Sequence, residues 1–271
     1  MEAIFNDYIS PFFLAILQGI TEFLPVSSSG HLVLLDEILP LDSGMLFDLV
    51  LHLATLMSVV AFYWKDIKSI FLGCIHEFGK VEERPNLKFV GFLLVATVIT
   101  GVIGIALKDY VEHQFRNVMI VGALLIVNSL ILLASRKQGV FKLSDGKLNL
   151  KTALLIGLAQ GVAVLPGISR SGSTITTALL VGIESKECAK ISFLLSIPAI
   201  LGAFIFKIPE MKNLQIVNLG VVLAAAVVAS IVGYFCLKLL NNMLKKANFY
   251  LFAPYCFVVG LLALIVGIWI L

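Results

Sequence analysis

Two long apolar stretches of the chain are each interrupted near the middle by proline, glycine and serine. Residues 8–35 read YISPFFLAILQGITEFLPVSSSGHLVLL, and residues 152–183 read TALLIGLAQGVAVLPGISRSGSTITTALLVGI. Each stretch contains one formally charged residue, Glu22 in the first and Arg170 in the second. Because proline, glycine and clustered serines interrupt helices, each stretch is predicted to form two half-helices joined by a turn.

The predicted half-helices are too short to cross a bilayer. They cover residues 8–24 and 28–39 in the first stretch, and 152–165 and 171–183 in the second. A spanning helix needs about 20 apolar residues, so each pair is expected to be re-entrant. Non-helical backbone at membrane depth survives only where protein or water lines it. The turns LPVSSSGH (24–31) and LPGISRSGST (165–174) should therefore lie inside the protein.

The composition identifies a polytopic membrane protein. Of 271 residues, 59% are hydrophobic and 14% charged, and the mean hydropathy is +1.02. Soluble domains are about 45–50% apolar and about 25% charged, so this chain cannot cover a surface that faces water. The net charge of +3 is too small to indicate a nucleic-acid partner. The four cysteines form no CxxC pair and are expected to be small buried hydrophobes.

Six further segments are apolar and long enough to be predicted as transmembrane helices. They are residues 44–64, 87–107, 118–135, 189–206, 215–237 and 249–271. Basic residues concentrate in loops 65–88 and 136–151 and after residue 237, which predicts that these regions are cytoplasmic. The first re-entrant pair is then expected to enter from outside and the second from the cytoplasm.

The two interrupted stretches share an ordered set of residues. The matched positions are Gln18-Gly19 and Gln160-Gly161, Leu24-Pro25 and Leu165-Pro166, and Ser27 to Gly30 and Ser169 to Gly172. Three predicted spans separate the copies. Because this number is odd, the two copies have opposite orientations in the membrane. The sequence therefore predicts one membrane domain, residues 1–271, with inverted repeats over approximately 1–135 and 136–271. The alternative is chance similarity among small residues.

The repeat predicts an anion site. The second half-helix of each pair begins at its serine-rich turn, so two helix N-termini point into the protein. Such termini present free N–H groups and partial positive charge, and they commonly bind phosphate. Arg170 lies at one of them and can bind a phosphate through two hydrogen bonds.

Several polar side chains in these stretches are candidates for chemistry. Glu22 is a carboxylate within an apolar stretch, and such residues are expected to have a functional role. With Gln18, four residues earlier, it offers oxygen ligands to a divalent cation. The alternative for Glu22 is a structural pair with Arg170. His31 beside the serines is a candidate general acid or base, or else it hydrogen-bonds the turn. His52 and Asp48, another pair four residues apart, are interpreted as structural.

Hydroxyl groups are concentrated at both turns and supply N-caps and hydrogen bonds, and one of them is a candidate nucleophile. They are Ser27, Ser28, Ser29, Ser169, Ser171, Ser173 and Thr174.

At these residues the chain resembles a known family. QGITEFLPVSSSGHL (18–32) and PGISRSGST (166–174) are similar to the two signature motifs of the undecaprenyl-pyrophosphate phosphatase family, also called the bacitracin-resistance family. The resemblance implies a phosphatase that releases phosphate from undecaprenyl pyrophosphate, with Mg²⁺ or Ca²⁺ as cofactor. It also implies a multi-pass protein of the bacterial inner membrane, with inverted repeats, re-entrant pairs and an active site that opens to the outer face.

The resemblance also implies roles for individual residues. Ser28, His31, Glu22 and Arg170 are expected to be catalytic, and Glu22 and Gln18 to bind the cation. The family's first motif has Glu or Gln at the position of Gln18, and the missing charge weakens Gln18 as a ligand without excluding it. The residues expected to bind substrate are Ser27, Ser29, Gly30, Ser169, Ser171 and Thr174.

Two mechanisms and other functional classes remain open from the sequence. Ser28 attacks the terminal phosphorus, with His31 accepting its proton or protonating the leaving group; alternatively water attacks directly, with His31 or Glu22 as base. A secondary transporter or lipid flippase would use the same inverted-repeat anion site. An intramembrane serine protease fits Ser28 beside His31 but not Arg170. Glycines such as Gly101 and Gly104 permit helix pairing in a homo-oligomer.

Overall fold

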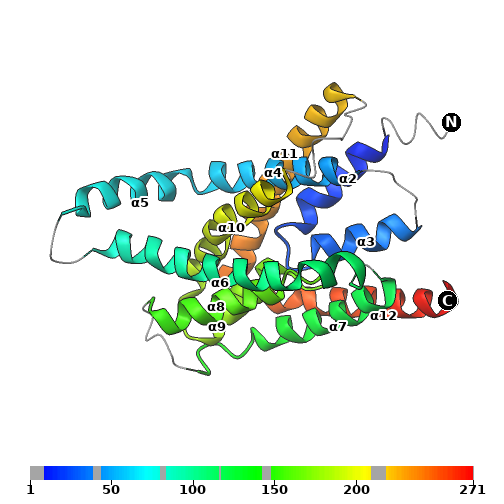
Figure 1. The fold of residues 1–271 in the computed structure, drawn as a ribbon. Helices are drawn as coiled ribbons and strands as arrows, with labels where there is room; N and C mark the ends of the chain where they lie inside the picture. The colour runs from blue at the N-terminus through cyan, green and yellow to red at the C-terminus, as the bar shows by residue number, and fades with distance from the viewer. Residues whose placement is uncertain are drawn as a thin grey trace.

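The structure, a computed structural model, describes residues 9–38, 44–79, 84–115, 117–141, 148–208 and 218–270. Every regular element in these ranges is helical (Figure 1). In chain order they are α2 (Ser10–Thr21), α3 (Ser28–Ile38), α4 (Gly44–Phe62), α5 (Trp64–Glu77), α6 (Pro85–His113), α7 (Val118–Ala134), α8 (Leu150–Val162), α9 (Arg170–Leu180), α10 (Ser185–Lys207), α11 (Leu219–Lys245), the 3-10 helix η3 (Phe249–Phe252) and α12 (Ala253–Ile270).

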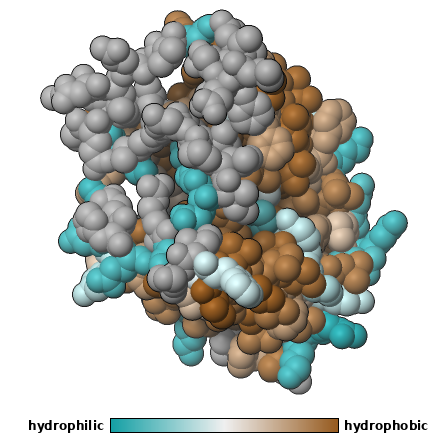
Figure 2. Space-filling model, turned by 90° about the vertical axis from the view of Figure 1, so that its right-hand side faces the viewer, coloured by the Kyte–Doolittle hydropathy of each residue, from teal (hydrophilic) through white to brown (hydrophobic). Residues whose placement is uncertain are grey.

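Four helical segments in the described ranges are long and apolar enough to cross a membrane. They are α6, α10, α11 and η3 with α12, and the bent pair α4–α5 is a possible fifth. Helix α7 is apolar but has 17 residues. Each of the six predicted spans therefore coincides with a helix, although residues 215–217 and 271 lie outside the described residues. Figure 2 shows apolar side chains over much of the described surface, as expected for contact with lipid.

The predicted loop over 65–88 is wrong in its first half. Residues 64–77 form helix α5, bent by 72° from α4. Its apolar residues recur at three- and four-residue intervals, at Ile67, Ile70, Phe71 and Ile75, which is the amphipathic pattern of a helix. The sequence prediction assigned Lys65 and Lys68 to a loop, although both lie within this helix.

Both interrupted stretches form the predicted pairs of half-helices. The first pair is α2 and α3, broken over residues 22–27, and the second is α8 and α9, broken over residues 163–169. The second half-helices are capped alike. Ser27 Oγ accepts a hydrogen bond from Gly30 N at 3.2 Å, and Ser169 Oγ accepts one from Gly172 N at 3.0 Å. Equivalent serines therefore define the start of both helices.

The first half-helices pack against long helices through the matched glycines. A Cβ on Gly19 of α2 would lie 2.8 Å from the carbonyl oxygen of Ala229 in α11. A Cβ on Gly161 of α8 would lie 2.5 Å from Ile103 Cδ1 in α6. The absence of a side chain thus permits both close contacts. Helices α7 and α12 lie side by side (Figure 1), also through glycine contacts.

Candidate functional site

The two breaks meet and hydrogen-bond to each other. Gly167 N donates to Ser27 Oγ at 3.0 Å, and Ser171 Oγ donates to the Phe23 carbonyl at 3.0 Å. Backbone approaches backbone so closely that a Cβ on Gly30 would lie 2.9 Å from Gly167 Cα. Ser27 has φ +70° and Gly167 φ +107°, so both turns pass through the left-handed region. Residues 140 apart in sequence are therefore fixed at one junction.

Asn128 of α7 connects both breaks from a fully buried position. Its Nδ2 donates to the Pro25 carbonyl at 3.0 Å, and its Oδ1 accepts from Ser169 N at 3.0 Å. The Asn128 side chain thus provides a hydrogen-bond partner for one backbone group in each break. Asn128 was not among the site residues predicted from the sequence, although an asparagine within the apolar segment 118–135 was a usable signal.

We expect Asn128→Leu to lower the free energy of unfolding by roughly 2–5 kcal/mol, because the buried Ser169 N–H loses its hydrogen bond to Asn128 and the Pro25 carbonyl keeps only the weak donor Cys256 Sγ. Thermal unfolding of the purified protein in detergent measures the loss. Val127→Ala is a matched control, since the neighbouring Val127 is exposed on the same helix. An unchanged melting temperature in Asn128→Leu would contradict this account of the junction.

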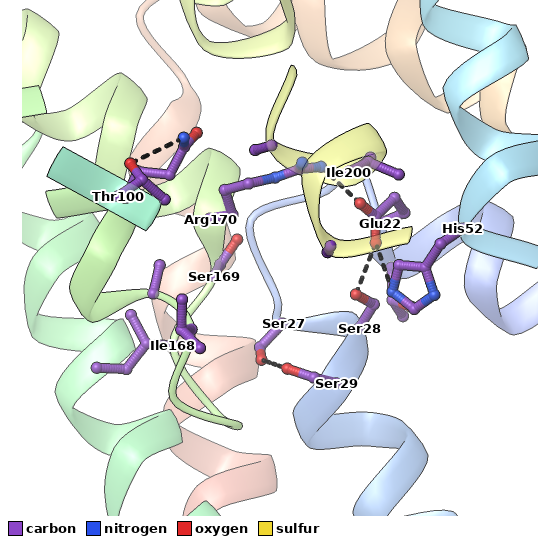
Figure 3. A pocket seen from close by; sticks show the side chains of 16 residues that line it. Glu22, Ser27, Ser28, Ser29, His52, Thr100, Ile168, Ser169, Arg170 and Ile200 are labelled. Atoms are coloured by element: carbon purple, nitrogen blue, oxygen red, sulfur yellow. Dashed lines mark hydrogen bonds and ion pairs between the residues drawn. The ribbon is translucent and has the colours of Figure 1, made fainter. Parts of the chain in front are cut away.

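Glu22 lies at the centre of a polar cluster beside the junction (Figure 3). Its Oε1 pairs with Arg170 Nη2 at 2.5 Å, and its Oε2 accepts from Ser28 Oγ at 2.8 Å and from Gln18 Nε2 at 3.0 Å. The carboxylate is buried, and pairing offsets part of its desolvation cost. The pair with Arg170 considered from the sequence is therefore present, and it lies directly beside the candidate nucleophile.

His52 joins this cluster from α4. Its Nε2 lies 3.7 Å from Glu22 Oε2, and its Nδ1 lies 2.7 Å from the Asp48 carbonyl oxygen. Because a carbonyl accepts only, Nδ1 carries the proton and Nε2 faces the carboxylate. The sequence predicted a structural role for His52. Its spacing of four residues from Asp48 gave no indication that α4 packs beside the first break.

His31 has different neighbours from those expected of a base for Ser28. Its Nδ1 bonds the Ser27 carbonyl at 2.8 Å, and its Nε2 bonds the Tyr255 hydroxyl at 2.8 Å. The His31 and Tyr255 rings are stacked with centroids 5.7 Å apart. These contacts match the alternative in which His31 holds the turn, and its catalytic role stays a prediction.

A cavity of about 270 Å³ opens at the junction. Glu22, Ser28 and His52 lie at one end, Thr100 and Gln160 line it as well, and its other polar lining residues are Thr21, Ser27, Ser29, Ser169 and Arg170. The remaining lining is apolar, from Ala163, Val164, Ile168, Ala199, Ile200 and Ala203.

Other predicted site residues support the walls rather than line the cavity. Ser171 bonds the first break, Gly30 lies against Gly167, and Thr174 Oγ1 lies 2.6 Å from Ser192 Oγ.

The donor set suits a cation that takes few protein ligands. Gln18 Oε1 is buried and accepts no hydrogen bond from the described residues, because its Nε2 is directed at Glu22. Gln18 is fully buried and is not among the residues that line the cavity, so Glu22 is the carboxylate that the cavity offers to a cation. The described residues contain no group of three His, Cys, Asp or Glu that would form a closed metal site. Mg²⁺ typically uses one or two carboxylates, with substrate phosphates and water completing its shell, and this site fits that pattern.

Comparison with known proteins gives matches over nearly the whole chain. The family model described as bacitracin resistance protein BacA matches residues 11–262, which include both breaks. A protein of Methanosphaera stadtmanae named undecaprenyl-diphosphatase is 38% identical over 97% of this chain and 99% of its own. A protein of the same name from Desulforapulum autotrophicum is 41% identical over 94% and 96%. Undecaprenyl-diphosphatase 1 of Bacillus cereus is 38% identical over 93% and 95%.

Proposed function

Since this chain belongs to the BacA family of bacitracin resistance proteins, we propose that it is a membrane-embedded undecaprenyl-diphosphatase. It hydrolyses undecaprenyl pyrophosphate to undecaprenyl phosphate and inorganic phosphate, which returns the carrier lipid to cell-wall synthesis and confers bacitracin resistance. The structural observation that carries the proposal is the contact of one buried carboxylate, Glu22, with both Ser28 and Arg170 beside the cavity. Phosphoryl transfer needs this combination of a nucleophile, a proton acceptor and a cationic group.

The architecture that we propose is a single membrane domain, residues 1–271, with six spans and two re-entrant pairs. Its halves, approximately 1–135 and 136–271, are inverted repeats. Equivalent contacts support this: Gly19 of α2 packs on α11 as Gly161 of α8 packs on α6, and Ser27 and Ser169 cap equivalent helices. Loop charges favour an orientation in the cell membrane with the basic regions on the cytoplasmic side, and the family resemblance implies that the cavity opens to the outer face.

Substrate binding places the charged head between the half-helices while the polyprenyl chain stays in lipid. The N-termini of α3 and α9 begin at Ser28 and Arg170, beside the cavity, and favour negative charge there. An incoming pyrophosphate competes with Glu22 for the Arg170 guanidinium. As Arg170 shifts toward the phosphate, its contact with Glu22 Oε1 weakens, while Ser28 stays bonded to Glu22 Oε2.

Ser28 is the nucleophile in this mechanism. Its Oγ attacks the terminal phosphorus, its proton passes to Glu22 Oε2 along the 2.8 Å hydrogen bond, and undecaprenyl phosphate leaves. Water then cleaves the phosphoserine and releases inorganic phosphate. The contacts support Glu22 rather than His31 as proton acceptor, and His31 positions Ser28 by holding the Ser27 carbonyl. Direct attack by water is the alternative.

The cofactor in this proposal is a divalent cation, Mg²⁺ or Ca²⁺. Glu22 would hold it at the cavity, and Gln18, which bonds to Glu22 but does not line the cavity, is the second proposed protein ligand; phosphate oxygens and water would be further ligands. When bound, it neutralises charge on the phosphoryl oxygens.

Phosphate release from undecaprenyl pyrophosphate by the purified protein tests the function and the cofactor together. We expect release with Mg²⁺ or Ca²⁺, a loss of about 10²-fold or more with chelator because charge on the phosphoryl group is no longer offset, and recovery when the cation returns. Unchanged release after exhaustive chelation would refute the cofactor. No release from folded protein under any condition would refute the phosphatase and direct attention to lipid flux in liposomes.

A further inference from the structure

Gln160 of α8 carries a buried carbonyl oxygen that the proposed mechanism leaves unused. The side chain is 2% exposed and lines the cavity. Its Nε2 donates to Thr100 Oγ1 at 3.1 Å, whereas its Oε1 accepts no hydrogen bond within the described part of the chain. A buried acceptor without a partner is costly, so a molecule that enters the cavity is the natural donor.

The direction of the Gln160 amide is determined by its neighbours. Thr100 Oγ1 has one hydrogen, and backbone carbonyls of Ala96 and Gly157 lie 2.9 and 3.2 Å from it. That hydrogen is directed at these carbonyls, so Thr100 accepts from Gln160. The amide nitrogen must therefore face Thr100, and the oxygen must face away from it.

Water is the ligand that this carbonyl oxygen fits. Ionised phosphate oxygens are acceptors and cannot donate to it. A cation site would need a carboxylate nearby, and the one carboxylate among the cavity's lining residues, Glu22, belongs to the reacting cluster. Figure 3 shows Thr100 across the cavity from Ser28 and Glu22, with Arg170 between them. Because Gln160 is bonded to Thr100, a water held by its oxygen lies on the wall of the cavity across from Ser28.

We propose that Gln160, oriented by Thr100, binds and orients the water that hydrolyses phosphorylated Ser28. The inference rests on the proposed phosphatase function and assigns its second step. The water oxygen bonds to phosphorus while the bond from phosphorus to Ser28 Oγ breaks. The electron pair of that bond stays on Oγ, which takes back the proton held by Glu22. Both water hydrogens leave with the product as dihydrogen phosphate. In-line attack of this kind requires the water opposite the leaving oxygen.

The test is a rapid-quench experiment on Gln160→Met with substrate labelled in the terminal phosphate. Methionine keeps the length of the side chain and removes the carbonyl oxygen. We expect a burst of undecaprenyl phosphate equal to the enzyme present, label retained on the protein, and phosphate release slowed by about 10²-fold, as for the loss of one positioning contact. Wild-type protein should release both products at equal rates.

Two further variants keep the test decisive. Leu158→Met is the matched control, because Leu158 is exposed on the same helix and lies outside the cavity lining. Thr100→Val removes only the hydroxyl that orients Gln160. It should give the same burst of undecaprenyl phosphate and a smaller slowing of phosphate release. This variant keeps the proposal testable if Gln160→Met does not fold. Equal slowing of both products, or no slowing, would overturn the assignment. Absence of undecaprenyl phosphate from the wild type would instead refute the phosphatase.

Discussion

Arg170→Ala is expected to lower kcat/KM for undecaprenyl pyrophosphate by about 10³-fold or more, the range measured for arginines that stabilise phosphoryl transfer. Arg170 is the one Lys or Arg among the residues that line the cavity, and it begins helix α9 at the junction of the breaks. Its loss removes the group that draws the pyrophosphate head into the cavity and offsets charge as the bond breaks. Steady-state kinetics in detergent measure the effect.

Two comparisons separate loss of charge from loss of fold. Arg170→Ala also leaves Glu22 buried without its cation, which destabilises the protein. Adding Glu22→Gln to Arg170→Ala removes that unpaired charge and should restore the melting temperature without restoring activity. Arg136→Ala is the control for arginine loss in general, because Arg136 stacks on Tyr250 outside the cavity lining. More than a tenth of wild-type activity in Arg170→Ala would contradict the proposed role.

Ser28→Ala should reduce turnover by at least about 10⁴-fold, since removing a nucleophile removes the covalent route entirely. Substrate labelled in the terminal phosphate should leave acid-stable label on Ser28 of the wild type and none on the variant. Ser29→Ala should have a much smaller effect, because Ser29 lines the same cavity but Ser28 is the hydroxyl bonded to Glu22.

Substantial activity in Ser28→Ala would end the phosphoserine mechanism and favour direct attack by water. Glu22 would then be the candidate base. In that case Glu22→Gln should abolish phosphate release while Ser28→Ala retains it, and the burst expected of Gln160→Met should not occur.

The sequence predicted the parts of the site that depend on local pattern and symmetry. Proline, glycine and serine at residues 24–31 and 165–174 revealed both breaks because these residues cannot continue a helix comfortably. The ordered match between the stretches then placed Glu22 and Arg170 near each other, and the structure joins them.

The remaining contacts depend on which helices become neighbours, and periodicity does not encode that. Asn128 reaches the junction because α7 packs beside α9. Tyr255 reaches His31 across the fold, and His52 reaches Glu22 from α4. Helix α5 was missed for another reason, since its charged face concealed its apolar spacing.

The junction also bears on the alternative function. A rocking transporter would move one repeat against the other around a central site. Here such motion would break the bonds from Gly167 to Ser27, from Ser171 to Phe23 and from Ser169 to Asn128, in a region that water does not readily re-solvate. The structure and the comparisons favour the phosphatase.

The contact between His31 and Tyr255 has a consequence for biosynthesis. The two residues are 224 positions apart, and Cys256, next to Tyr255, completes the surroundings of Asn128. A ribosome therefore delivers Glu22, Ser28 and His31 to the membrane long before their last neighbours exist. Until α12 inserts beside α7, these polar groups must be sheltered by other means, such as water or an insertion factor. The active site can therefore be completed only after α12 has been synthesised. A nascent chain that ends before α12 contains both motifs but lacks the residues that complete the site.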